Sequence, residues 1–409
     1  MYAMSSPQRR VPLPNASYVA EVKRTCSALC DSQKIQVSTT AIKRLLFSPS
    51  FLSSFKRVSG YHGLNFPLNF PSVLSEVNFL SVLSLLNFGS GYRVPLHHQT
   101  GRGAWDSIRA LMFGLYLSSS TGNGNLLSAK GMQTISEQQI ADLMSVNLYI
   151  EQPHNEIPGV SINTLGGPLY DLVKLIAATL QETGKILEDL GDPDLGTFVV
   201  RSLREADAAK HGADPNAGAD AILSKTWTII DNQPVYCFKK ALFLIYAIVI
   251  RFGIRSTPPF PLLNTSQIPV FTDNVLPSML VHLGVVDLSR STAHGLHTIF
   301  PNAADKAQID SLLQPLPKSH TSDSEKLFPT EGPALNLEQA YVLRAAALDA
   351  CERIVHVART LDPDSLQADQ KWIQSITLPE LDLWLWAVAK DRADYRTLER
   401  FTLRDTVFF

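Results

Sequence analysis

The chain has 409 residues, 45% of them apolar and 18% charged, so it is long and apolar enough to bury a large core and is not intrinsically disordered. Lys and Arg number 36 and Asp and Glu number 38, which leaves a formal net charge of -2. This near balance excludes a strongly basic nucleic-acid coat and a polyacidic tail protein. It also disfavours direct action on DNA, which needs a basic face.

The N-terminus, the cysteines and the apolar runs together indicate a cytoplasmic protein. Residues 1–15 predict a flexible tail, and no apolar stretch follows its basic residues, so we expect no signal peptide. Four cysteines are too few for a disulfide scaffold. Cys26 and Cys30 have no further metal ligands close by, so we expect reduced thiols and no metal or other cofactor. The longest uncharged apolar run, 241–250, is half of the roughly 20 residues that a membrane span needs.

The first half of the chain alternates helical patterns with loops. Apolar spacing predicts helical structure over 16–55 and 105–117, and a turn followed by a helix over 128–144. Between the first two, residues 60–104 mix short apolar runs with Gly, Pro and Asn, which indicates ordered loops and short elements.

The clearest predicted helix is 168–190, where apolar residues recur close to a 3.6-residue period. Pro168 suits its first turn and Gly191 its end. A polar stretch at 207–220 predicts a loop, and the apolar segment 238–252 predicts a buried helix.

The last third contains two interruptions and two helices. The proline-rich stretch 255–269 cannot form a regular helix, and 301–335, poor in large apolar residues, predicts a loop excursion. Capping-box patterns at 336–339 and 377–380 each predict the start of a helix.

These elements predict a mainly α, multi-helical globular protein with few or no strands, because no long strand-period alternation and no internal repeat occurs. We expect one large helical catalytic domain over 16–409. The phosphate-binding, dinucleotide-binding, zinc-protease and nucleophile-elbow signatures are missing, which counts against motors, hydride transfer and metalloproteases.

Asp273 stands between apolar residues in the segment 270–277, which ends on a proline. This pattern predicts either a carboxylate held at a rigid helix entrance or a plain N-cap whose oxygen accepts a backbone N–H. Lys239 and Lys240 begin the most apolar helix. Since neighbours on a helix differ by about 100°, one can face inward, where it would form an ion pair with an acid, or both can lie at the surface.

Asp382 and Trp386 are four residues apart and share one face of a predicted helix. An acid beside an indole would grip a planar heterocycle that carries N–H donors. Alternatively, the acid is favoured by the helix dipole and the tryptophan belongs to the core.

Seven stretches of the chain share their order and spacing with one protein family. They are 77–93, 101–117, 182–187, 235–253, 269–289, 340–355 and 378–409. Through them the chain, over about residues 70–409, resembles the queuosine salvage protein family, the queuosine 5′-phosphate N-glycosylase/hydrolases, and looks like a fungal-type member. The resemblance implies an all-helical fold similar to helical DNA glycosylases. It also implies a hydrolase that releases the base queuine from queuosine 5′-monophosphate for reuse in transfer-RNA modification.

The same resemblance implies the site residues by position. They are Asn87, Phe88, Trp105, Lys239, Phe271, Asp273, Asp382 and Trp386. Asp273 would stabilise the positive charge that builds on the sugar, with Lys239 beside it, while Asp382 would accept N–H bonds from the base. The aromatic residues would stack on the substrate and Asn87 would orient it. We expect a small-molecule nucleotide as partner, no direct nucleic-acid or membrane contact, and a monomer.

Two departures from the family pattern affect the substrate contacts. Asn274 and Val275 replace a Tyr-Arg pair after the motif aspartate, and Gly89–Gly91 replaces a small residue followed by Phe and Trp. We therefore expect Asn274 among the substrate contacts and a cation from elsewhere, Arg93 or Arg102, at the phosphate.

Three other functions remain open on the sequence. The first is a relative that binds a nucleotide or modified base without cleaving it, and the second is a glycosylase for an unmodified nucleotide. The third is a helical scaffold for protein partners, which predicts an exposed apolar groove in place of a closed pocket.

Overall fold

The computed structural model describes residues 18–59, 63–64, 66–120, 124–154, 156–208, 219–220, 227–230, 233–303, 305–315 and 328–409. The protein is mainly helical, with 61% helix and 7% strand, and its sheets are small and two-stranded. The predicted fold class is therefore confirmed.

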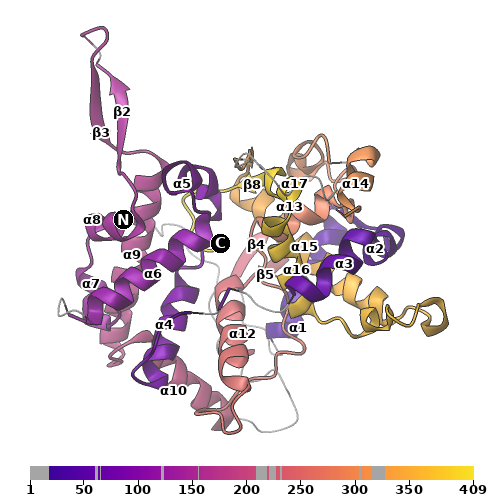
Figure 1. Cartoon of the computed structure of the whole chain (residues 1–409), viewed down its shortest axis with the longest axis horizontal. Coiled ribbons are helices and arrows are strands. Elements are labelled where there is room, and N and C mark those ends of the chain that lie inside the picture. The colour runs from indigo at the N-terminus through magenta and orange to yellow at the C-terminus, as the bar shows by residue number, and fades with distance from the viewer. Residues whose placement is uncertain are drawn as a thin grey trace.

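One group of helices comes from the first half of the chain and occupies the left of Figure 1. It comprises α4 (Val73–Leu85), the 3-10 turn η1 (Ser90–Tyr92), α5 (Arg93–Thr100), α6 (Ala104–Ser120), α7 (Ala129–Thr134), α8 (Glu137–Met144), α9 (Pro168–Asp189) and α10 (Leu195–Ala208). Within it, α9 packs against α7 and α8, and α4 packs against α10 and α6.

A second group joins the N-terminal helices to those of the C-terminal part, on the right of Figure 1. It comprises α1 (Tyr18–Ser32), α2 (Thr39–Leu46), α3 (Pro49–Val58), α13 (Val275–His282), η2 (Ala293–Thr298), α14 (Lys306–Leu312), α15 (Leu337–Arg359), η4 (Pro363–Ser365), η5 (Lys371–Ser375), α16 (Leu378–Asp391) and α17 (Ala393–Thr397). The buried helix α12 (Lys239–Gly253) stands between the groups and packs on α4.

Strands contribute little to the core. Three pairs are antiparallel: β1 (Gln36–Val37) with β6 (Val286–Asp287), β2 (Tyr149–Pro153) with β3 (Ser161–Leu165), and β4 (Trp227–Ile230) with β5 (Gln233–Tyr236). The fourth pair, β7 (Glu331–Ala334) with β8 (Arg400–Thr402), is parallel and contains a register shift. The β2–β3 hairpin projects from the body of the molecule (Figure 1).

Local sequence signals fix several helix ends as predicted. Asn336 and Gln339 form a capping box on α15, and Thr377 and Glu380 form one on α16, so two free N–H groups are bonded at each start. Gly191 follows α9 with a φ of 74°, a left-handed conformation that suits glycine.

Helix α16, which carries the predicted acid and tryptophan, is fixed by aromatic packing. Trp384 is fully buried, its ring centre lies 4.8 Å from that of Phe51 on α3, and its indole N–H donates to Ser54 Oγ at 2.8 Å. These contacts lock one face of α16, which also packs against α13 and α15.

Three sequence predictions need correction. Residues 60–104 were expected to hold only loops and short elements, yet α4 is a 13-residue helix. It is buried on nearly all faces, so it has no apolar stripe from which a helical period could be read. The predicted segment 128–144 is two helices, α7 and α8, and the excursion 301–335 contains α14 and β7. Residues 1–15, 209–218 and 316–327 lie outside the described residues.

No single helix within the described ranges has both the length and the apolar composition to cross a membrane. The bent pair Val73–Leu85 and Ser90–Thr100 has them only when its two helices are taken together.

Candidate functional site

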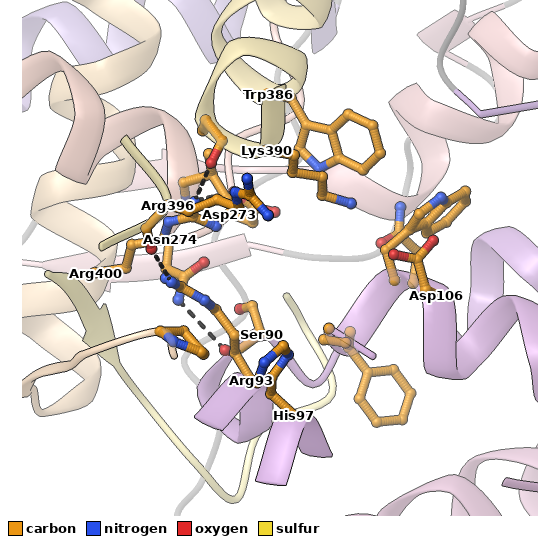
Figure 2. A pocket seen from close by; sticks show the side chains of 18 of the residues that line it. Ser90, Arg93, His97, Asp106, Asp273, Asn274, Trp386, Lys390, Arg396 and Arg400 are labelled. Atoms are coloured by element: carbon orange, nitrogen blue, oxygen red, sulfur yellow. Dashed lines mark hydrogen bonds between the residues drawn. The ribbon is translucent and has the colours of Figure 1, made fainter. Parts of the chain in front are cut away.

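A cavity of about 290 Å³ lies where the two helix groups meet. One side is formed by η1 and the starts of α5 and α6, and the other by the entrance of α13, the end of α16 and the C-terminal segment. Figure 2 shows Trp386 and Lys390 above the space, Arg93 and His97 below it, and Asp106 at its right. This volume is at the lower end of the range typical of small-molecule sites.

Asp273 lies in this cavity at the entrance of α13 and is only 7% exposed. Its Oδ1 accepts the backbone N–H of Val275 at 2.6 Å, and its Oδ2 lies 3.9 Å from Lys239 Nζ. One oxygen therefore serves the local turn, as the N-cap alternative expected, although the N-cap position itself is Asn274. The second oxygen is directed toward the lysine.

Lys239 is the inward lysine of the pair at the start of α12. Its Nζ donates to the main-chain oxygen of Asn87 at 2.9 Å and to Asn87 Oδ1 at 3.1 Å. Burial lowers the pKa of Lys239 to about 8, against the opposing effect of Asp273. Lys240 does not line the cavity itself; its Nζ lies 4.7 Å from the centre of the ring of Phe88, which does.

A recess of about 20 Å³ adjoins the main cavity, which is room for one water molecule or one amino group. Asp382 lines this recess together with Asp273, Lys239 and Asn87. Asp382 Oδ2 accepts the backbone N–H of Phe271 at 2.7 Å. Burial raises the pKa of Asp382 well above its usual range, and the bond from Phe271 opposes that rise.

Aromatic side chains line the recess, and two of them, Trp105 and Trp386, line the main cavity as well. The rings of Trp105 and Trp386 meet edge to face with their centres 6.1 Å apart, and Trp105 meets Phe243 in the same way at 5.4 Å. Lys390 Nζ lies 3.5 Å from the centre of the Trp386 ring, a cation–π contact. One face of Trp386 is therefore covered by an ammonium group.

We use the name cationic wall for four basic residues that line the main cavity: Arg93, Lys390, Arg396 and Arg400. Arg93 Nη2 donates to the main-chain oxygen of Arg396 at 2.5 Å, and Arg400 Nη2 donates to that of Ala389 at 2.8 Å. Burial lowers the pKa of Lys390 to about 8.

Some hydrogen-bond donors at the cationic wall have no acceptor among the described residues. Within the described residues, Arg93 Nη1, Arg400 Nε and the Ser90 hydroxyl, all from side chains that line the cavity, have no hydrogen-bond partner. Burial and the charge of Arg400 lower the pKa of Arg93 to about 9, and burial lowers that of Arg400 to about 10, so both remain charged at neutral pH. Such a surface is suited to an anion with several acceptor oxygens.

The structure brings every sequence-predicted site residue to this place. The main cavity is lined by Asn87, Phe88, Arg93, Trp105, Lys239, Asp273, Asn274 and Trp386, and the recess adds Phe271 and Asp382. The Asn274 amide donates to the main-chain oxygens of Phe401 and Ser90, at 2.9 and 3.4 Å. Its side chain therefore joins the C-terminal segment to η1. Arg102, the other suggested cation, donates to the Met144 oxygen and does not line the cavity.

Sequence reasoning missed Lys390, Arg396 and Arg400 as site residues. A signal exists, because Arg392, Arg396, Arg400 and Arg404 recur every fourth residue. That spacing is ambiguous, since Arg392 pairs with Asp394 and Arg404 with Glu331, whereas the two between them line the cavity.

No known protein-family model matches this chain, and a search of curated proteins finds no match. Among the described residues, no group of three or more His, Cys, Asp or Glu side chains could hold a metal ion.

Proposed function

We propose that this protein hydrolyses the N-glycosidic bond of queuosine 5′-monophosphate and releases the base queuine. One observation carries the proposal: the Asp273 carboxylate, Lys239 and Trp386 converge on a single cavity that also contains the cationic wall. A carboxylate beside a lysine, an aromatic wall and several cations would suit cleavage of a ribosyl C–N bond in an anionic substrate. The alternative of a scaffold for protein partners is less well supported. It predicts an exposed apolar groove, whereas Asp273, Lys239 and Trp386 line a cavity that also contains basic residues.

Cleavage of the bond builds positive charge on the ribose, as in glycoside hydrolysis. The Asp273 oxygen that faces the cavity would stabilise this charge and accept a proton from the attacking water. The bond from Val275 fixes the carboxylate, so it needs little reorganisation during the reaction. Lys239, held by both oxygens of Asn87, would orient that water beside Asp273.

The leaving base is a 7-deazaguanine, in which carbon replaces the ring nitrogen that is easiest to protonate. Stabilisation of the sugar cation therefore matters more than protonation of the leaving group. The electron pair of the broken C–N bond leaves on the base nitrogen, which then takes a proton from solvent. The recess at Asp382 has room for one amino group of the base, and the carboxylate would accept its N–H bonds. Trp105 and Phe271 offer aromatic surface beside that edge.

The cationic wall supports a phosphorylated substrate. A 5′-phosphate carries nearly two negative charges, and Arg93 Nη1, Arg400 Nε and the Ser90 hydroxyl have no hydrogen-bond partner in the part of the chain that the structure describes. These cations would replace the arginine that the resemblance implies at the position of Val275. Lys390 would share its charge between Trp386 and the phosphate.

The test is incubation of the purified protein with queuosine 5′-monophosphate, followed by chromatography for free queuine. We expect base release by the wild-type chain and none above background by Asp273→Asn. Tight binding of the nucleotide without release would favour the binding-protein alternative. Faster release from guanosine 5′-monophosphate than from the queuosine nucleotide would favour a glycosylase for unmodified nucleotides.

A further inference from the structure

Arg344 is a buried cation that the proposed reaction does not use. It lies in the middle of α15, is 0% exposed, and forms no ion pair with an acid among the residues that the structure describes. An unpaired charge in a protein interior is costly unless other groups compensate it. The groups that contact the Arg344 guanidinium therefore indicate its role.

Two of the contacts of Arg344 are hydrogen bonds to main-chain carbonyls far apart in the sequence. Nε donates to the Thr272 oxygen at 2.9 Å, and Nη2 donates to the Cys237 oxygen at 3.3 Å. Thr272 directly precedes Asp273, and Cys237 stands two residues before Lys239. The guanidinium is also covered by an aromatic ring, with the centre of Phe409 4.3 Å away.

We propose that Arg344 is a positioning residue that holds Asp273 and Lys239 at their working separation by bonding the two chain segments that carry them. The inference rests on the proposed hydrolase function for its kinetic consequence, but not for its structural one. A guanidinium is planar and presents its donors in a fixed fork, so it sets the distance between two carbonyls as a lysine ammonium cannot.

The charge of Arg344 has a second, separable effect on the site. The pKa of Lys239 is lowered first by burial and then by the Arg344 charge, while Asp273 and Asp382 raise it. The neighbouring Lys240 has its own pKa lowered to about 7, by burial first and then by the Lys239 charge. Removal of the Arg344 charge should therefore move the Lys239 pKa upward.

Two variants separate geometry from charge. Arg344→Lys keeps the positive charge but loses the planar set of donors that bonds both carbonyls. We therefore expect kcat for base release to fall at least about tenfold, while KM changes by less than about threefold. Arg344→Gln loses both, so kcat should fall further and the alkaline limb of the pH–rate profile should move to higher pH. Arg353→Gln is the matched control, since Arg353 lies on the same helix and pairs with Asp349, away from the cavity. It should behave as wild type.

A measurement without substrate keeps this inference distinct from the proposed function. Acetylation of Lys239 by acetic anhydride across a pH series, read by mass spectrometry with fragmentation to resolve Lys240, reports the Lys239 pKa directly. A shift to higher pH in Arg344→Gln would support the inference even if the wild-type protein released no base, an outcome that would count against the hydrolase alone.

The inference would be overturned by wild-type kcat and wild-type Lys239 titration in both variants. Failure of both variants to fold, judged by circular dichroism and thermal unfolding, would also overturn it, because Arg344 would then stabilise the core without a specific role at the site.

Discussion

The recess and the cationic wall, the two regions of the candidate site, hold their charged side chains in different surroundings. At the recess, Asp273, Asp382 and Lys239 stand within apolar and aromatic surroundings, and each is held by a short bond to the main chain or to Asn87. At the cationic wall, four basic residues line one cavity, and some of their donors have no hydrogen-bond partner among the residues that the structure describes.

This difference indicates a division of labour. Groups that must act on a reacting atom benefit from fixed geometry, which the recess provides. Groups that attract a phosphate need net charge and free donors, which the wall provides. The recess should therefore control kcat and base affinity, and the wall should control KM for the phosphorylated substrate. Four experiments would test this division, here from the largest expected effect to the smallest.

The first and largest effect should come from Asp273→Asn, which removes the charge that stabilises the sugar cation and keeps the shape. We expect kcat for base release to fall by about 10² or more, with nucleotide affinity retained, in single-turnover and calorimetric measurements. Turnover near the wild-type rate would exclude Asp273 from the mechanism.

The second effect concerns the wall. Arg400→Met removes a charged donor, so KM for the monophosphate should rise about tenfold to a hundredfold, while KM for the unphosphorylated nucleoside should not change. Arg57→Met is the matched control, because Arg57 pairs with Asp391 on the surface outside the cavity. An equal rise for nucleoside and nucleotide would contradict a phosphate role for the wall.

The third effect is on base recognition. Asp382→Ala should weaken binding of free queuine about tenfold in a calorimetric titration, because a charge-assisted hydrogen bond is lost. Since burial raises the pKa of Asp382, wild-type affinity for the base should itself decline as the pH falls and the carboxyl is protonated. Affinity that does not change in the variant would remove Asp382 from recognition.

The smallest effect is a pH dependence of kcat. The pKa of Lys239 is lowered to about 8, so the lysine is protonated below that pH and loses its charge above it. If the ammonium orients the attacking water, kcat should decline as the pH rises through about 8. Arg in place of Lys239 keeps its charge, so an active Lys239→Arg variant should lack this alkaline limb.

Features that depend on interactions between neighbouring residues could be predicted from the sequence, and features that depend on distant contacts could not. The capping boxes of α15 and α16 and the ends of α9 were predicted because three or four neighbouring residues determine them. Helix α4 was missed because nearly all of its faces are buried, which removes the periodic signal. Asp273 and Lys239 could be singled out because a charge inside an apolar stretch is unusual in any fold.

The sequence by itself determined the helical class, the ends of α9, the capped starts of α15 and α16, and the acid and lysine that stood out in apolar stretches. Only the tertiary structure decided that Arg93, from the first helix group, meets Arg396 and Arg400, some 300 residues later, at one wall. It alone decided which members of the four-residue arginine repeat face the cavity and which pair with acids outside it. The reason is physical: local hydrogen bonds and side-chain periods act over one or two turns of chain. The direction of a charged side chain, by contrast, depends on what distant elements pack against it.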